Sequence, residues 1–364
     1  MTAAKPSRKR APSGPARIAE VAKLAGVSAA TVSRALANPE KVSPEAREKV
    51  MAAVRTTGYT PNVAARNLRA RKSRMVLVVV PNIGNPFFSE VLRGIDETLS
   101  AAGYGLIIGN IGQDDDEGRR FVDVAFAGQV DGVILLNGRI LQARGRKLTD
   151  AATPVVAACE TIPGAPIPQV EVQNREAAEA VARTLLDLGH TRFGYVEGPR
   201  ANILERERGG GFRDALERAG IPKSSLVVFP GDFSFRSGSA AAERFLALAE
   251  RPGAVFCAND EMAIGFVKTV RDAGLQVPRD VSVVGFDAID FASYCEPPLT
   301  TVVQPRGAIG QKAAELLIER MRGGTSELPP HVVRFHATLR PGGSTGPAPA
   351  AGRGRPAAEA LTER

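Results

Sequence analysis

The sequence predicts an α/β protein that joins an all-helical N-terminal head to a two-lobed body built on parallel sheets. Residues 17–59 have helical periodicity in three segments, with capping serines before the second and third and a glycine after the first and third. From Met75 onward, continuous apolar runs alternate with helical segments, which is typical of parallel sheets with helices on both faces. The excess positive charge lies in the first fifth of the chain. These observations predict a basic helical module attached to a separate α/β body.

Three helices are expected in the head. The first covers residues 18–24 and ends at Gly26, a residue type that readily adopts the left-handed conformation that ends a helix. The second begins with Ser28 as its N-cap and runs to about residue 36. The third begins with Ser43 as its N-cap and ends before Gly58.

The body is expected to contain eight strands. Apolar runs with strand-like length lie at 75–81, 105–110, 130–136, 154–159, 193–198, 226–231, 254–259 and 281–287. Helical periodicity fills the segments between them, for example at 89–102, 176–188 and 237–249. Eight strands suit two smaller sheets better than one, so two lobes are predicted.

The charge is divided unequally along the chain. Residues 1–74 hold 16 Lys and Arg against 4 Asp and Glu, a net charge of +12, whereas the whole chain carries +8. The remaining residues therefore carry a net charge of −4. A compact basic module on a mildly acidic body is the electrostatic pattern of nucleic-acid binding. A solubilising tail explains the charge of residues 1–16, but it does not explain the charge on the patterned helices of 17–74.

The first two helices have the pattern of a helix-turn-helix. Ala22 is small where the helices cross, and Gly26 permits the tight turn between them. The second helix would expose one face to DNA, formed by Ala29, Ala30, Ser33 and Arg34. Because any helical hairpin can produce this pattern, it is a weak signal when taken alone.

Longer motifs strengthen the prediction. The chain contains VAKLAGVSAATVSRAL, YTPNVAARNL, NPFFSEVLRGI, DGVILL, AVFCANDEMAIG, VPRDVSVVGFD and PPLTTVVQP. Over residues 17–340 the chain resembles the lactose-repressor (LacI/GalR) family. The segments GDFSFRSG, AVFC and PPLTTVVQPR look most like the cytidine-repressor branch of that family.

The resemblance implies which head residues contact DNA. Three polar side chains would bind phosphates and fix the register: Ser28, Thr31 and Asn38. Arg34 would point into the major groove, where its forked donors match the N7 and O6 acceptors of guanine. Ala29 and Ala30 occupy positions that family members vary to choose operators, and here they offer only apolar contact.

The resemblance also implies a hinge helix over residues 62–69. Paired copies of this helix would enter the minor groove from Asn62 onward, with Leu68 as the wedge at a central base step and Ala65 one turn earlier. An ordinary buried role for Leu68 is the alternative. The head departs from the family at Arg17, where a capping Thr is usual, so the first capping box should be incomplete. Phosphate contacts by residues 1–15 would compensate for the missing cap.

The body should bind a small molecule between its lobes, at the carboxyl ends of the strands. The candidate effector contacts are Asn85, Phe87, Phe88, Glu160, Gln173, Arg208, Phe256, Asn259 and Asp287. Arg208 is a candidate by resemblance. Carboxylates, amides and one Arg among aromatic rings suit a sugar, polyol or nucleoside.

Several of these positions have a structural alternative. Phe88 is equally compatible with a core position, and Asp260 fits a helix N-cap better than a ligand contact. Residues 202–204 stand where some relatives place polar contacts, which puts those contacts in doubt.

Catalysis and metal binding have little support in the sequence. It contains no GxSxG, HExxH or P-loop motif, and His190, His331 and His336 are not spaced as a ligand cluster. The acidic run at 114–118 lacks the spacing of a calcium loop. We expect no enzyme activity, no metal and no cofactor.

The expected compartment is a reducing cytoplasm. No apolar run approaches the roughly 18 residues that a membrane span requires, and the charged N-terminus lacks the apolar stretch of a secretion signal. Cys159, Cys257 and Cys295 lie far apart, in or near apolar runs, as free thiols do.

The expected organisation is a disordered basic tail (1–16), a helix-turn-helix domain (17–60), a hinge helix and linker (61–74), a two-lobed effector and dimerisation domain (75–340) and a disordered tail (341–364). Such a chain would act as a homodimer on double-stranded operator DNA, with a tetramer left open, and respond to a small-molecule effector. Repression is expected. The alternatives are an activator of the same architecture, a sugar-binding protein and an enzyme acting on sugars or nucleosides.

Overall fold

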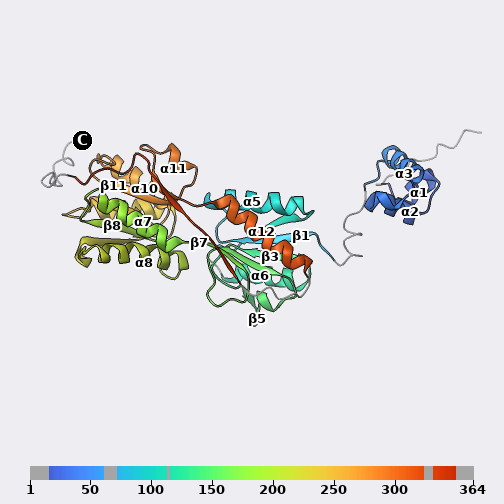
Figure 1. The fold of residues 1–364 in the computed structure, drawn as a ribbon, viewed down its shortest axis with the longest axis horizontal. Helices are drawn as coiled ribbons and strands as arrows, with labels where there is room; N and C mark the ends of the chain where they lie inside the picture. Colours follow the sequence, from blue (N-terminus) through green and yellow to red (C-terminus); the bar gives the residue numbers. More distant parts are fainter. Residues whose placement is uncertain (1–15, 61–71, 113–114, 324–330, 350–364) are drawn as a thin grey trace, which may run out of the picture. The chain divides into compact units, whose positions relative to one another are not determined.

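The computed structural model describes residues 16–60, 72–112, 115–323 and 331–349 (Figure 1). The chain divides between Ser73 and Arg74 into two compact units, the head and the body. Each unit is described separately below.

The head contains three α-helices and one short 3-10 turn within its described residues. They are α1 (Ile18–Ala25), α2 (Ala29–Ala37), η1 (Pro39–Lys41) and α3 (Pro44–Thr57). Val21, Val32 and Val50, one from each helix, are fully buried at its centre. The three predicted helices are therefore confirmed.

The helix ends in the head follow the capping signals of the sequence. Ser28 accepts a hydrogen bond from the backbone N–H of Thr31, and Ser43 accepts one from Ala46. Gly26 and Gly58, after α1 and α3, have φ of 65° and 63°, the left-handed conformation that favours glycine.

The first lobe of the body is built on a parallel sheet. Over the described residues this sheet has the order β13-β7-β6-β3-β1-β2, and every strand pair in it is parallel. Its strands are β1 (Met75–Val80), β2 (Gly105–Asn110), β3 (Gly132–Leu135), β6 (Val155–Cys159), β7 (Gln169–Val172) and β13 (Val332–Phe335). Its helical elements are α5 (Phe87–Ala101), α6 (Asp115–Phe126), η2 (Leu148–Asp150) and α12 (Arg306–Arg322), and β4 (Gln142–Ala143) pairs with β5 (Arg146–Lys147) in a separate hairpin.

The second lobe repeats this plan. Its sheet has the order β14-β12-β11-β10-β8-β9 over the described chain, with only the β14 edge antiparallel. The strands are β8 (Phe193–Glu197), β9 (Leu226–Pro230), β10 (Ala254–Cys257), β11 (Ser282–Asp287), β12 (Thr300–Val303) and β14 (Thr338–Arg340). The helical elements are α7 (Asn174–Asp187), α8 (Ile203–Arg218), η3 (Lys223–Ser225), α9 (Phe235–Leu246), α10 (Asp260–Asp272) and α11 (Phe291–Tyr294).

Two lobes with parallel sheets are what the sequence predicts, and all eight predicted strands are present. Four further sheet strands were not predicted: β7, β12, β13 and β14. Each has three or four residues, too few for a clear apolar run. Where the structure describes it, the chain passes between lobes three times, after β7, after β12 and after β13.

Glycine sets the close approach of α5 and α12, which lie side by side in Figure 1. A Cβ atom on Gly94 of α5 would lie 2.2 Å from the carbonyl oxygen of Gly307. A Cβ atom on Gly310 of α12 would lie 2.0 Å from the carbonyl oxygen of Val91. The two helix backbones are therefore in direct contact at this crossing.

The C-terminal segment corrects one expectation. Disorder was predicted for 341–364, but residues 341–349 pack against the second lobe. Ser344 is fully buried, donates to the carbonyl of Val283 and accepts from the N–H of Thr300. Gly346 donates to Ser282, and the carbonyl of Gly346 accepts from His190. The Pro- and Gly-rich composition concealed these specific hydrogen bonds; residues 350–364 lie outside the described part.

Candidate functional site

The outer face of α2 is the candidate DNA-reading surface of the head. Val32 and Ala35 are buried and fix the rotation of the helix. The opposite face is exposed and carries the predicted residues Ala29, Ala30, Ser33 and Arg34. The structure therefore places these four residues together on one surface.

The N-terminus of α2 holds two adjacent hydroxyl groups. The Ser28 Oγ accepts from the Thr31 N–H at 3.1 Å and lies 2.9 Å from the Thr31 Oγ1. A helix N-terminus also carries partial positive charge, which favours phosphate. Asn38 is exposed at the other end of α2, where its N–H donates to the carbonyl of Arg34. The predicted hinge residues Asn62, Ala65 and Leu68 lie outside the described residues.

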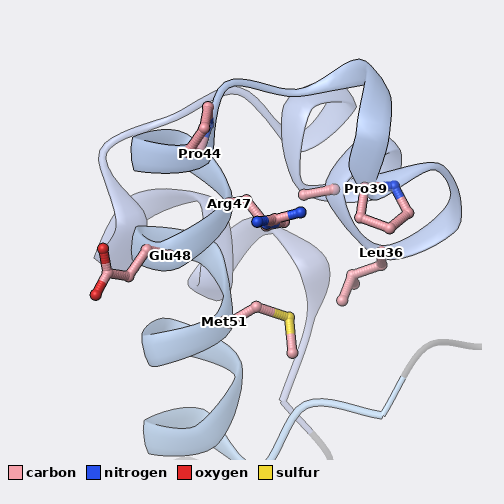
Figure 2. Close-up of a pocket in the computed structure, with 7 residues that line it drawn as sticks. Leu36, Pro39, Pro44, Arg47, Glu48 and Met51 are labelled. Atoms are coloured by element: carbon pink, nitrogen blue, oxygen red, sulfur yellow. The ribbon is translucent and has the colours of Figure 1, made fainter.

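A hollow lies beside this surface, between the C-terminal end of α2, η1 and α3 (Figure 2). It is lined by Ala35, Leu36, Pro39, Pro44, Arg47, Glu48 and Met51. Figure 2 shows the side chains of Arg47 and Met51 extending from α3 toward the side of α2 and η1. None of the four reading residues lines it, so the hollow is separate from the candidate DNA surface.

α1 begins without a side-chain cap, as the sequence predicts. Arg17 is the N-cap residue of α1, and its side chain makes no capping hydrogen bond. Glu20 stands three residues later, in the first turn. One half of a capping box is therefore present without its partner.

In the body, residues at the carboxyl ends of strands from both lobes lie close together. We call Glu160, Asn202, Arg208 and Asp287 the inter-lobe site. Glu160 follows β6 in the first lobe, and Asn202 is the N-cap of α8 in the second. The Glu160 Oε2 accepts from the Gly138 N–H at 2.8 Å and from the Asn202 Nδ2 at 3.2 Å. A hydrogen bond thus joins the two lobes at a predicted effector residue. Burial raises the pKa of Glu160 above its ordinary value.

Arg208 and Asp287, both predicted effector residues, form a buried ion pair. The Arg208 Nη2 lies 3.3 Å from the Asp287 Oδ1, and the two side chains are 3 % and 8 % exposed. Arg208 also donates to Asn174 at 2.9 Å and to the carbonyl of Ala258 at 2.6 Å. Its guanidinium carbon lies 3.8 Å from the centre of the Phe286 ring. Arg208 is therefore held in one orientation from several sides.

Asp287 ends β11 with φ of 111°, which is strained for a residue with a side chain. The Gln304 Nε2 donates to the Asp287 Oδ1 at 2.6 Å, from the segment that leads back to the first lobe. Burial raises the pKa of Asp287 to about 6, against the opposing effect of the Arg208 charge. A strained backbone and a carboxyl with a shifted pKa are both features that concentrate at functional sites.

The pKa of the Cys159 thiol is affected by charged groups from both lobes. Burial raises the pKa of Cys159, and the charges of Glu160 and Asp287 raise it further, whereas Arg208 lowers it. Cys159 and Glu160 belong to the first lobe, whereas Arg208 and Asp287 belong to the second. The predicted residues Glu160, Arg208 and Asp287 therefore share one electrostatic environment.

Other predicted effector residues have structural roles. Phe256 is fully buried among the rings of Tyr195, Phe212 and Phe286, which argues against a ligand contact. Phe87 and Phe88 begin α5 and belong to the core of the body. The Asn85 side chain accepts from the N–H of Phe87 at 2.8 Å and supports that helix start. Gln173 precedes α7 at the first passage between lobes.

The start of α10 differs from the expectation that Asp260 is an N-cap. Asn259 is the N-cap and accepts from the N–H of Met262, while its Nδ2 donates to the carbonyl of Phe233 at 2.9 Å. Asp260 is the first helical residue, fully buried, and accepts from the Thr301 hydroxyl and the Ile289 N–H. The helix therefore begins one residue earlier than the sequence suggested.

Three residues at the same strand ends were missed by sequence reasoning. Asn137 follows β3, and its Oδ1 is buried without a hydrogen-bond partner among the described residues. Phe233 follows β9 with φ of 68° and is positioned against Gly198, where a Cβ atom would lie 2.2 Å from its ring. Gln304 follows β12 and binds Asp287. Their position just after a strand was the available signal, but β12 was not predicted.

Neither a metal-binding cluster nor a membrane-spanning helix is found among the described residues. Among the residues that the structure describes, no group of three or more His, Cys, Asp or Glu side chains is arranged to hold a metal ion. In the same part of the chain, no helix has the length and apolar character of a membrane span.

Two family models match the chain. Residues 17–62 match "Bacterial regulatory proteins, lacI family", and residues 182–345 match "Periplasmic binding protein-like domain". The first match covers the helix-turn-helix, and the second covers most of the second lobe together with α12 and β13 of the first lobe.

Known relatives cover almost the whole chain. The HTH-type transcriptional repressor CytR of Escherichia coli K12 is 41 % identical over 308 residues, which is 85 % of this chain and 90 % of the relative. A Lac repressor dimer bound to operator and an anti-inducer has a TM-score of 0.80 at 25 % identity, covering 92 % of this chain and 100 % of that one. The regulator CelR in complex with cellobiose has a TM-score of 0.68 at 30 % identity, covering 90 % and 99 %.

The similarity extends through both units, so the resemblance that the sequence motifs suggested is confirmed. It also confirms the expectation that the chain is not an enzyme, because the relatives are transcription regulators. The helix-turn-helix head and the two-lobed body belong to a DNA-binding transcription regulator, and this chain is a member of the LacI family.

Proposed function

We propose that the chain is a dimeric repressor that binds a pseudo-palindromic operator, with an affinity set by a sugar, polyol or nucleoside in the inter-lobe site. The observation that carries the regulatory part is the Glu160–Asn202 hydrogen bond between lobes, beside the buried Arg208–Asp287 pair. A ligand held by these side chains would contact both lobes at once, so its binding would depend on how the lobes are arranged.

The head supplies the DNA-binding half of the proposal. Its exposed reading face offers one forked donor, Arg34, and the hydroxyls of Ser28 and Thr31 stand at the helix start. The net charge of +12 in residues 1–74 attracts the phosphate backbone. A helix-turn-helix reads one half-site, so a pseudo-palindromic operator requires two copies of the chain.

Exposed apolar side chains on the body support dimerisation. Phe291 and Tyr294 of α11 are 56 % and 87 % exposed, and Ile107 and Ile108 on the edge strand β2 are each 40 % exposed. Each pair places two exposed apolar side chains close together in the sequence, and exposed apolar patches mark surfaces that a partner can cover. The solved Lac repressor is a dimer on its operator. A tetramer would need a further surface.

The chemistry of the inter-lobe site favours a ligand rich in hydroxyl groups. Asp287 and Asn137 offer acceptors, Arg208 offers donors, and Phe233 offers an aromatic face. Rings with several hydroxyl groups match such a mixture of acceptors, donors and aromatic surface. Relatives of the chain have been solved with cellobiose and with ribose.

The proposed regulation is thermodynamic linkage. An effector changes operator affinity only if it binds the DNA-competent and DNA-incompetent arrangements of the body with different affinity. The hinge segment, residues 62–69, would carry this difference to the heads. Induction and co-repression both fit the scheme. Operator DNA and free thiols at Cys159 and Cys257 favour the cytoplasm as the place of action.

The proposal is tested by a thermal-shift screen of sugars, polyols and nucleosides, followed by operator-binding measurements with any compound that stabilises the protein. A ligand at 100 times its Kd should stabilise the folded state by about 2.7 kcal/mol. The same compound should change operator affinity. In-vitro transcription separates repression from activation: repression predicts more transcript when the protein is omitted, and less transcript would make the chain an activator.

A further inference from the structure

Glu261 has an unusual position at the second lobe's strand ends. It is the second residue of α10, directly after β10, and is 7 % exposed. Its Oε1 is buried and has no hydrogen-bond partner among the residues that the structure describes. Leaving a buried carboxylate oxygen without a partner destabilises a fold, so such a group requires an explanation, and a bound ligand is one.

Two carboxyl groups, Asp287 and the exposed Asp232, act electrostatically on Glu261. Burial raises the pKa of Glu261 to about 7, and the charges of Asp287 and Asp232 raise it further. Asp287 is the last residue of β11 and Asp232 follows β9, so the carboxyls belong to different elements of the lobe. The Asp287 charge is balanced by Arg208. Asp232 is held by the N–H and hydroxyl of Ser234, which are neutral donors.

We propose that Glu261 selects an effector that carries an aliphatic amine on its sugar ring, with the ammonium group bound between Glu261 and Asp232. This inference rests on the effector-binding function proposed above and narrows its ligand class. It follows from a buried carboxyl whose Oε1 has no partner among the described residues, and from the two carboxylates that act on it, of which only Asp287 is balanced by Arg208.

An ammonium group suits this place better than a hydroxyl. A hydroxyl donates one hydrogen bond to Glu261 and leaves the repulsion among the carboxyls unchanged. An ammonium group donates three hydrogen bonds and also cancels charge, which is worth most where water is excluded. Charge-assisted hydrogen bonds of this kind are about twice as strong as neutral ones. The amine can belong to a free hexose or to the ribose of a nucleoside.

The first experiment needs no ligand and uses the full chain. A carboxyl whose pKa is higher in the folded state than in the unfolded state destabilises the fold when ionised. For Glu261 this loss is absent below pH 4.5, grows between pH 4.5 and 7, and is complete above pH 7. The variant Glu261→Gln should therefore melt at a higher temperature than the wild type at pH 8, and at the same temperature at pH 4.

The matched control is Glu243→Gln on the exposed face of α9, which should leave the melting temperature unchanged at both pH values. A structural role for Glu261 predicts the opposite result for Glu261→Gln, because a stabilising interaction would be lost. A lower melting temperature at pH 8 would therefore overturn the proposal.

The second experiment uses matched pairs of probes: glucosamine against glucose, and 3′-amino-3′-deoxyadenosine against adenosine. The amino member of at least one pair should bind more tightly than its hydroxyl partner, and Glu261→Gln should abolish that preference. Binding of the ammonium form to the wild type, corrected for the fraction of the amine that is protonated at each pH, should be about tenfold weaker at pH 6 than at pH 8, because a carboxyl with a pKa near 7 is about one-tenth ionised at pH 6. Glu261→Gln should lose most of that pH dependence and keep only the part due to Asp287.

The outcomes separate the two proposals. Equal or tighter binding of glucose or adenosine overturns the amine assignment but supports an effector site. An amine preference that persists in Glu261→Gln removes Glu261 from the ligand contacts. If none of the four probes binds, the amine assignment is overturned. The proposed function is then judged by the wider screen of sugars, polyols and nucleosides.

Discussion

At the scale of single residues, the DNA-reading face of this regulator is chemically sparse. Ala29 and Ala30 expose only methyl groups, and Ser33 offers one short hydroxyl. Arg34 is the exposed side chain of α2 that can form two parallel hydrogen bonds to one base. Discrimination between operators should therefore depend strongly on Arg34.

The variant Arg34→Ala should lose about 1–3 kcal/mol of preference for its operator over scrambled DNA, the value of one bidentate base contact. Weaker, salt-sensitive binding should remain, because phosphate attraction does not depend on sequence. Fluorescence anisotropy at two salt concentrations, with an operator obtained by in-vitro selection, measures both quantities. Arg55→Ala, which removes an exposed charge from α3, is the control. Unchanged selectivity in Arg34→Ala would contradict the assignment.

Asp287 combines a structural and a ligand-binding role, and two substitutions separate them. Asp287→Ala leaves the Arg208 guanidinium buried without its carboxylate, which should destabilise the body by about 3–5 kcal/mol. Asp287→Asn keeps an oxygen that accepts from Arg208 and Gln304, so it should fold normally and bind operator without ligand. Its response to the effector should be lost, as judged by operator affinity with and without ligand. A full response in a folded Asp287→Asn protein would remove the carboxylate from the effector site.

At the scale of secondary structure elements, the helix starts of the head show what a cap contributes. α2 and α3 are capped by Ser28 and Ser43, whereas α1 begins at Arg17 without a side-chain hydrogen bond. Glu20 already occupies the third position of a capping box. The missing half can be supplied by one substitution.

Arg17→Ser should therefore stabilise the head by roughly 1 kcal/mol, since its hydroxyl can accept from the N–H of Glu20. Ser28→Ala should destabilise the head by a similar amount. Calorimetry of the full chain reports both changes in the unfolding transition of the head. A lower melting temperature for Arg17→Ser would show that the arginine side chain contributes more than its absent cap.

The contact between α5 and α12 gives a second prediction at this scale. Gly310→Ala would place a Cβ atom 2.0 Å from the carbonyl oxygen of Val91, so the helices must separate, at a cost of about 1–3 kcal/mol or more. In the same helix, Gly307→Ala would meet only the end of the Arg93 side chain, at 3.9 Å, and should gain up to about 1 kcal/mol of helix propensity. Chemical denaturation of the two variants measures the difference. Equal stability would mean that the helices are not in backbone contact.

Local patterns predicted the longer elements well and the short ones poorly. The eight apolar runs became strands because parallel strands buried on both faces must be apolar throughout. β12 and β13 depend on neighbours that are distant in the sequence, so their four residues have little local signal. The same limit applies to the site. Glu160 and Asp287 were candidates because they stand at the carboxyl ends of predicted strands, whereas Gln304 follows a short strand that was not predicted.

The roles of site residues were harder to predict than their positions. Phe256 has the residue type of a ligand wall, but it faces a cluster of aromatic rings in the core. The Glu160–Asn202 hydrogen bond joins residues from different lobes, and no local pattern encodes that pairing. The partners of a side chain depend on the tertiary fold, which local sequence specifies only in part.

At the scale of the whole molecule, dimerisation and ligand response must occur in one assembly. The operator proposed here has two half-sites, so operator affinity should fall when the dimer is weakened. The combined variant Phe291→Ser with Tyr294→Ser removes two of the most exposed apolar side chains of the body. It should keep its fold, shift toward monomer in analytical ultracentrifugation and bind operator less tightly. Ile83→Ser, on another segment and about as exposed as Phe291 (59 % against 56 %), is the control. A variant that remains dimeric would exclude α11 from the subunit contact.

The charge distribution has a consequence for the whole chain as well. The basic head should make the affinity for any DNA strongly dependent on salt concentration. The effect of the ligand on operator affinity should add to this salt effect. Ligand effects and salt effects are therefore separated only when they are compared at one salt concentration.

The central claim is that occupancy of the inter-lobe site controls operator binding. The most direct test is operator affinity of the wild type and of Asp287→Asn, measured at fixed salt with and without a compound that stabilises the wild type in the thermal-shift screen. The account predicts a 5- to 150-fold change for the wild type, equivalent to about 1–3 kcal/mol of coupling, and no change for Asp287→Asn. A compound that binds the body tightly and leaves wild-type operator affinity unchanged would contradict it.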